Sequence, residues 1–168
     1  MPDTASASTW RDIKVYNNHA YIVADNAGPH GMQVFDLRNL RDSGGSSEVF
    51  SETAHYTEVH SAHNIVINGD IGYAYIVGSV GGGQTCGSGL HMVDIAGPAD
   101  PMFVGCFADP STGRSGTGYT HDAQCVTYAG PDSEYSGQEI CLGSNETAIS
   151  IADVTDKENP RAVSTASY

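Results

Sequence analysis

The chain has 168 residues, with 20 Asp and Glu against 7 Lys and Arg and a formal net charge of −13 at pH 7. Neutralising nucleic-acid phosphates needs a basic face, so this charge excludes nucleic-acid binding, and an anionic membrane surface would repel the chain. No apolar run approaches the roughly 18 residues that a membrane-spanning helix needs. We expect a single domain over residues 1–168, with a substantial core, no nucleic-acid partner and no membrane insertion.

Composition favours strands and turns over helices. The chain contains 20 Gly and 9 Tyr, and its Val, Ile and Tyr residues gather in short runs. Such residues are enriched in strands, whereas glycine is typical of turns. No stretch has a convincing amphipathic helical pattern, so we expect an all-β protein.

The first expected unit spans residues 10–58. Apolar and polar residues alternate on both sides of Asn17-Asn18, which predicts two strands joined by a hairpin turn at that pair. A third strand ends at Asp36. The connector that follows is rich in Ser, Gly and charge, and we expect residues 48–56 to form an outer strand.

The second and third units span residues 62–108 and 119–166 and repeat this order. Alternating residues flank Asn68-Gly69, which predicts another hairpin turn, and the third strands end at Asp94 and Asp153. We expect these closing aspartates, like Asp36 in the first unit, to cap the turns that follow them. The proline-marked connectors GPADP and TDKENP then lead into MFVGCF and RAVSTA, which are expected outer strands.

The three units form an internal repeat. They start about fifty to sixty residues apart, a period typical of propellers and arrays, and Asp12, Asn64 and Asp122 open their first strands. Four antiparallel strands per unit are typical of a propeller blade. We therefore predict about three propeller-type blades, at residues 10–58, 62–108 and 119–166. Because a closed propeller usually needs at least four blades, we expect a larger propeller or one that an oligomer completes.

Several stretches resemble a known family. They are NAGPHGMQVFDL, SAHNIVIN, CGSGLHMVDI, GCFAD, YTHDAQCV, GPDSEYSGQEIC and SNETAISIADVTDKENP. On these residues the chain is similar to the LVIVD-repeat propellers, and within them to the bacterial surface proteins called choice-of-anchor B. The resemblance implies an exported propeller held at the cell surface by a C-terminal sorting signal, and it implies no particular activity. Because the start MPDTASAST is not a signal peptide and no anchor is present, we expect a mature form or an excised piece.

Four cysteines, with no CxxC pair among them, predict disulfides rather than a zinc ribbon or a thioredoxin-like motif. Three pairings are open. We favour Cys125 with Cys141, which would face each other across a hairpin, and then Cys86 with Cys106. Oxidised pairs are typical of exported proteins, so we expect an extracellular or cell-surface location.

Propeller topology predicts one polar face. The loop that enters each first strand and the loop that joins the second strand to the third lie on the same side of a propeller, so their residues converge. The ligand face that we expect there contains Arg11, Asp12, Asp25, Asn26, Asn64 and Asn145.

The residues expected on the same face include several that could bind a divalent metal. The candidate ligands are His63, His121, His30, Asp122 and Glu146. Imidazole and carboxylate groups suit zinc or manganese, and carboxylate oxygens suit calcium, so all three metals stay open. The alternative, which we favour, is that the histidines hydrogen-bond to the neighbouring blade and stabilise the ring.

Motifs for covalent catalysis are absent from the sequence. There is no GxSxG elbow, no Cys beside a His, and no phosphate-binding glycine fingerprint in VGGGQTCGSG. We therefore expect an extracellular or cell-surface propeller that acts as a binding or interaction scaffold, with a divalent metal as an optional stabiliser, rather than an enzyme. One alternative is a metal-dependent hydrolase that uses the His63 and His121 face with a carboxylate base. Another is a self-assembling subunit of a surface layer or filament.

Overall fold

The computed structural model describes residues 6–41, 43–45 and 47–168. Its regular structure is strands with two short 3-10 helices, Leu37–Leu40 and Cys86–Ser88, and the described residues form no α-helix. The all-β expectation is confirmed. None of the described helices is long and apolar enough to cross a membrane.

Three four-stranded antiparallel sheets follow one another along the chain, and each matches one expected unit. The first sheet has the order β1-β2-β3-β4, the middle sheet β6-β7-β9-β10 and the third sheet β11-β12-β13-β14. Their bounds are β1 Arg11–Tyr16, β2 His19–Ala24, β3 Met32–Asp36, β4 Ala54–Tyr56, β6 Asn64–Asn68, β7 Tyr73–Val77, β9 Leu90–Asp94, β10 Met102–Phe107, β11 Asp122–Thr127, β12 Glu139–Ser144, β13 Ala148–Asp153 and β14 Arg161–Ser167.

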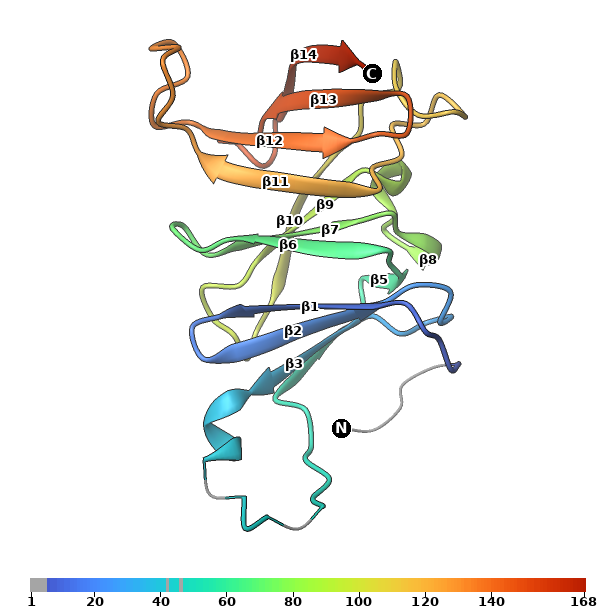
Figure 1. Cartoon of the computed structure of the whole chain (residues 1–168), viewed down its shortest axis with the longest axis vertical. Helices are drawn as coiled ribbons and strands as arrows, with labels where there is room; N and C mark the ends of the chain where they lie inside the picture. Colours follow the sequence, from blue (N-terminus) through green and yellow to red (C-terminus); the bar gives the residue numbers. More distant parts are fainter. Residues whose placement is uncertain (1–5, 42, 46) are drawn as a thin grey trace.

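The sheets form an open stack, with the middle sheet between the other two (Figure 1). Their first strands lie next to one another, because β6 contacts both β1 and β11. The described residues do not close into a ring. The four-stranded antiparallel units are therefore confirmed, whereas their identity as propeller blades stays a prediction.

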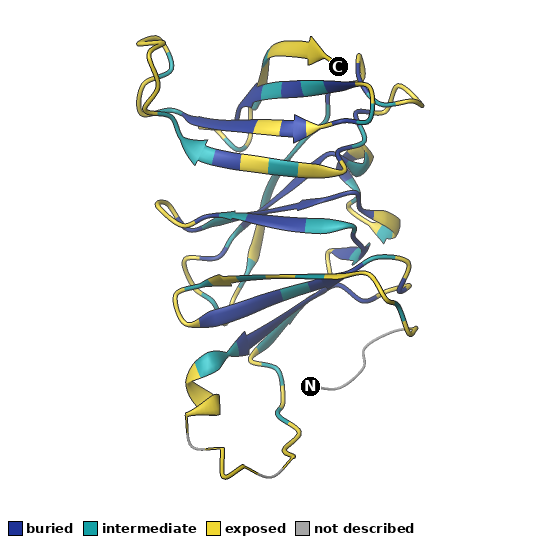
Figure 2. Ribbon diagram, viewed as in Figure 1, coloured by how far each residue is buried: buried dark blue, intermediate teal, exposed yellow. Residues whose placement is uncertain are grey.

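Two apolar clusters hold the stack together, and the middle sheet contributes to both. Ala74 and Ile76 of β7 belong to the cluster shared with the first sheet, whereas Tyr75 and Val77 belong to the cluster shared with the third. This is the period-2 alternation of a strand that is buried on both faces. Figure 2 shows β2, β7 and β9 largely buried and the terminal strand β14 exposed.

Local details confirm one of the expected hairpin turns and correct the other. Asn17 and Asn18 both have positive φ angles, 46° and 60°, as a two-residue primed turn requires. The pair Asn68-Gly69 does not form such a turn. Asn68 is still paired in β6, and the loop runs through residues 69–72 to Gly72, whose φ is 75°.

The outer strand of the first sheet is shorter than expected. It covers Ala54–Tyr56, the end of the expected stretch 48–56. A fourth, two-stranded sheet was not expected at all: β5 (Val59–Ser61) pairs with β8 (Val80–Gly83). Three glycines in the β8 segment hide its alternation, so the sequence carries no periodic signal there.

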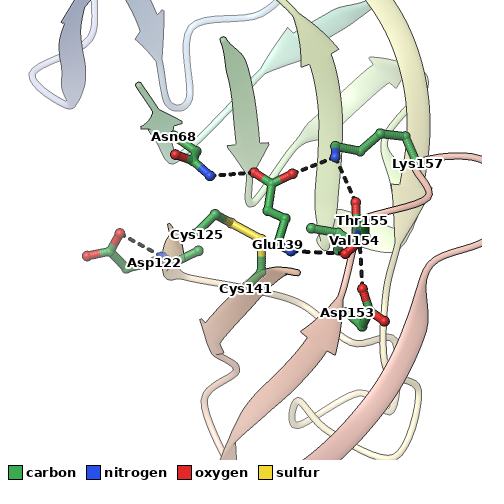
Figure 3. The surroundings of a disulfide bond; sticks show 10 residues. Asn68, Asp122, Cys125, Glu139, Cys141, Asp153, Val154, Thr155 and Lys157 are labelled. Carbon is green, nitrogen blue, oxygen red and sulfur yellow. Dashed lines mark hydrogen bonds and ion pairs between the residues drawn. A yellow bond between two sulfur atoms is a disulfide. The ribbon is translucent and has the colours of Figure 1, made fainter. Parts of the chain in front are cut away.

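Both favoured disulfides are present. Cys125 and Cys141 are directly opposite each other on β11 and β12, with a Cα–Cα distance of 4.1 Å (Figure 3). Cys86 is bonded to Cys106. Disulfides of this kind favour an oxidising setting. The closing aspartates also cap turns as expected, because the carboxylates of Asp36, Asp94 and Asp153 each accept a hydrogen bond from the backbone N–H two residues later.

A buried ion pair between Glu139 of β12 and Lys157, in the loop between β13 and β14, connects the third sheet to the middle sheet through contacts with Asn68 and Tyr73. Glu139, which is 3% exposed, accepts hydrogen bonds from Asn68 Nδ2 at 2.9 Å and from Lys157 Nζ at 2.5 Å (Figure 3). The Lys157 ammonium group also lies 4.2 Å from the centre of the Tyr73 ring. Every part of this pair therefore has a partner, as burying a charge requires.

Candidate functional site

The first strands of the three sheets carry the same local motif at the edge where they begin. The side-chain Oδ1 atoms of Asp12, Asn64 and Asp122 each accept a hydrogen bond from the next backbone N–H, at 2.9, 2.8 and 2.8 Å. The sequence repeat thus corresponds to a repeated structural feature. We call the region formed by Asp12, Asp25, His63, Asn64, His121 and Asp122 the polar edge.

Side chains of the polar edge connect neighbouring sheets. Asp12 Oδ2 in the first sheet accepts from the backbone N–H of Ile65 in the middle sheet at 3.1 Å. Asn64 Nδ2 in the middle sheet donates to Asp122 Oδ1 in the third at 2.9 Å. Asp12, Asn64 and Asp122 therefore form a ladder across all three first strands.

Asp25 and His63 make a second connection between the first and middle sheets. His63 Nδ1 lies 2.7 Å from Asp25 Oδ2, and both side chains are about one-quarter exposed. The backbone N–H of Asn26 donates to the other Asp25 oxygen at 2.7 Å, which holds the carboxylate in place. The imidazole is thereby oriented by a fixed carboxylate.

The His63 ring also meets the third sheet. Its centre lies 4.1 Å from that of His121, with an angle of 46° between the ring planes. Gly78 makes room for this arrangement, because a Cβ at that position would lie 2.6 Å from His63 Cβ, and its φ of 63° is one that side chains rarely adopt. Sequence reasoning did not identify Gly78, although a glycine at the end of a strand is the signal that could have found it.

The polar edge holds only part of the expected metal site. If His63 Nδ1 donates to Asp25, its Nε2 has a free lone pair, an arrangement common for histidines that bind metals. His121 makes no side-chain hydrogen bond to the described residues and lies beside it. However, no group of three or more His, Cys, Asp or Glu side chains within the described residues is placed to hold a metal ion.

The other three expected ligands, His30, Glu146 and Asp122, bind other partners. His30 is fully buried, and both of its ring nitrogens have partners: Nδ1 contacts Gly31 O at 2.9 Å and Nε2 contacts Arg11 Nη1 at 2.9 Å. Glu146 accepts a hydrogen bond from the Arg114 backbone N–H at 3.0 Å. Asp122 belongs to the ladder that joins the sheets. The structure does not bring the five candidates together around one point.

Of the expected ligand-face residues, Asn145 has a structural role. It is completely buried, donates to Thr112 Oγ1 and accepts from Thr120 Oγ1, both at 2.8 Å. These bonds attach the loop around Thr112 to the third sheet. Asn26 is an exposed turn residue with a φ of 50°.

A third connection between sheets involves His91, which was not among the predicted site residues. Tyr56 Oη from the first sheet lies 2.7 Å from His91 Nε2 in the middle sheet, and His91 Nδ1 lies 2.7 Å from Gln84 O. Burial without a charge partner lowers the pKa of His91 to about 4, so the ring is neutral at pH 7. His19 is also buried, with Nδ1 2.7 Å from Asn17 O.

The larger hollows described on the surface lie away from the polar edge. One of about 540 Å³ is lined by residues 53–58 and 99–103. Another of about 460 Å³ lies beside Gln138, Asp153 and Arg161. The polar edge therefore does not coincide with these hollows.

Comparisons with known proteins give no further assignment. No family model, no curated protein and no solved structure matches the chain.

Proposed function

We propose that the protein is an extracellular or cell-surface scaffold built from propeller-type blades, and that its polar edge stabilises the blade array rather than carrying out chemistry. Three observations support the propeller architecture. The sheets repeat one strand order, their first strands are neighbours, and the middle sheet is buried on both faces. The resemblance to LVIVD-repeat propellers favours the same architecture.

One observation carries the scaffold function: most polar groups of the polar edge already bind a partner in another sheet. Asp12 binds the middle sheet, Asn64 binds the third, and Asp25 binds His63. A catalytic site instead presents groups toward a substrate. Cross-sheet hydrogen bonds keep the blades in register, which is what a rigid binding scaffold requires.

Export and surface location are part of the proposal. Two disulfides leave no free cysteine among the described residues, as is common for proteins that work in oxidising compartments. The net charge of −13 suits a solvated extracellular surface and favours cationic over anionic ligands.

The test measures metal content and stability together. The protein, purified without chelators, and a His63→Ala/His121→Ala variant are compared by elemental mass spectrometry and by urea unfolding. The scaffold proposal expects much less than one metal ion per chain in both proteins and a less stable variant. Stoichiometric metal in the wild type, lost in the variant, would contradict the proposal.

A metal-dependent hydrolase remains the second candidate, and the Asp25–His63–His121 arrangement is the observation that favours it. A carboxylate orients one imidazole, and a second imidazole lies beside the first. Calcium, zinc and manganese are the metals to test, and water bound to such an ion could act as the nucleophile. This candidate requires ester hydrolysis that a chelator abolishes and that the double variant lacks.

A further inference from the structure

The two ends of the stack expose apolar faces that correspond to the faces buried between sheets. We call the outer face of the first sheet the front face, and it contains Ile13, Val15 and Ile22. We call the outer face of the third sheet the back face, and it contains Leu142, Ile149 and Ile151. Ile13 is 55% exposed and Leu142 is 39% exposed.

Strand pairing identifies the equivalent positions in the three sheets. Ile13 pairs with Ile22 in the first sheet as Ile65 pairs with Ile76 in the middle sheet. Ile65 and Ile76 are completely buried against the first sheet. The front face thus repeats a surface that elsewhere in this chain is covered by a preceding sheet.

The back face repeats the opposite surface. Leu142 pairs with Ile151 in the third sheet, as Tyr75 pairs with Met92 in the middle sheet and Tyr21 with Val34 in the first. These four equivalents are all completely buried, each pair against the sheet that follows. The back face therefore corresponds to a surface that elsewhere in this chain is covered by a following sheet.

We propose that the front face of one copy of this chain packs on the back face of a second copy. The protein then forms a head-to-tail dimer, closed by two identical interfaces. This contact between a front face and a back face already occurs twice within one chain: between the first and middle sheets, and between the middle and third sheets. The 168 residues of this chain supply three four-stranded sheets per copy, and propellers typically have four to eight blades. Two copies give six, whereas one or three copies fall outside that range.

This inference rests on the proposed propeller architecture but not on the role assigned to the polar edge. An interface between unlike faces closes into a ring only if the rotation between copies allows it, and otherwise it extends into a filament. The closed dimer therefore predicts a discrete particle rather than a polymer. If the metal test contradicted the scaffold function, the prediction of a head-to-tail dimer would still stand.

The experiment is sedimentation velocity with three single variants. Ile13→Asp places a charge on the front face, Leu142→Asp places one on the back face, and Ile71→Asp is the control. Ile71 is 42% exposed, a fraction similar to the 39% of Leu142. It lies in the loop between β6 and β7 of the middle sheet, away from both faces. Because all three side chains are partly exposed, each variant should fold, which circular dichroism checks.

We expect the wild-type protein and Ile71→Asp to sediment at twice the mass of the chain. Ile13→Asp and Leu142→Asp should each weaken the dimer by roughly a hundredfold, as loss of a central apolar contact can. Mixing these two variants should restore a dimer, because one of its two interfaces then carries no substitution.

The recovery on mixing is specific to head-to-tail pairing. If like faces paired, one of the single variants would stay dimeric on its own. Even a weak dimer with micromolar affinity forms at about 100 μM. A wild-type protein that is monomeric at this concentration would therefore overturn the proposal, and the front and back faces would then bind other partners. An open polymer, or a mixture that stays monomeric, would overturn it equally.

Discussion

Asp25 and His63 belong to different sheets, and their side chains meet with 2.7 Å between Asp25 Oδ2 and His63 Nδ1. The pair serves both functional readings. In the scaffold it links the first and middle sheets, and in the hydrolase it orients a metal ligand. Its contribution to stability is therefore the first quantity to measure.

Asp25→Ala should lower the free energy of unfolding by about 1 kcal/mol, because a partly exposed ion pair or hydrogen bond contributes little more than that. Urea unfolding followed by circular dichroism measures the change. The control is Glu48→Ala, which removes an exposed carboxylate that has no hydrogen bond to the described residues. Equal stability of Asp25→Ala and the control would show that the pair does not hold the sheets together.

The buried pair between Glu139 and Lys157 should matter more. Lys157→Met leaves the Glu139 carboxylate, 3% exposed, without its cation, and such an uncompensated buried charge costs about 3–5 kcal/mol. The double variant Glu139→Gln/Lys157→Met should recover much of the loss, because it buries no charge. Urea unfolding of the two single variants and the double variant measures this coupling.

The matched control for that pair is Lys14→Met. Lys14 also binds a carboxylate, Asp12, but its side chain is 38% exposed, so its loss should cost less than about 1 kcal/mol. Similar costs for Lys14→Met and Lys157→Met would show that the buried Glu139–Lys157 pair matters no more for stability than an exposed pair.

Much of the architecture was predictable because it depends on local patterns. Alternation around Asn17-Asn18 predicted a hairpin, and the positive φ angles of both residues explain why that pair suits the turn. The pairing of Cys125 with Cys141 followed from the hairpin between them. The closing aspartates, such as Asp36, cap their turns through bonds to nearby residues, which sequence spacing alone determines.

The site was less predictable because its contacts join distant parts of the chain. The topology correctly placed Asp25 near His63, 38 residues away. The topology does not predict that the two groups bind each other, or that Arg11 Nη1 contacts His30 Nε2. Those outcomes depend on rotamers and loop paths that no sequence pattern encodes. The metal site was predicted from residue type, whereas hydrogen bonding decided which side chains were engaged elsewhere.

His91 should make stability depend on pH. Its folded pKa of about 4 lies below the ordinary value of 6.5, because burial disfavours the charged ring. The unfolded chain therefore binds the proton first as pH falls. The stabilisation is complete above pH 6.5 and is lost progressively as pH falls toward 4, by up to about 3 kcal/mol in total.

Urea unfolding at pH 7.5 and 4.5 measures this dependence. His91→Gln, which cannot take up the proton, should lose most of the difference between the two pH values. His121→Gln is the control, since His121 is exposed and should leave the difference in place. If His91→Gln unfolds with the same pH dependence as the wild type, the buried ring is not its source.

Gly78 gives the most direct test of how the polar edge is built. Gly78→Ala places a methyl group 2.6 Å from His63 Cβ at a residue with a φ of 63°, so both backbone strain and a clash oppose it. We expect a loss of about 2 kcal/mol in the free energy of unfolding. Gly28→Ala is the control, because that residue has a similar φ of 67° but no atom within 4 Å of an added Cβ.

The comparison separates strain from displacement of the histidine. Both variants carry the backbone cost, whereas only Gly78→Ala should shift the His63 ring, which NMR detects through the imidazole resonances of His63 and His121. If the two variants lose the same stability and those resonances do not move, then Gly78 is needed only for its backbone angle. A larger loss with shifted resonances would establish that close packing of Gly78 against His63 fixes the contact between the middle and third sheets.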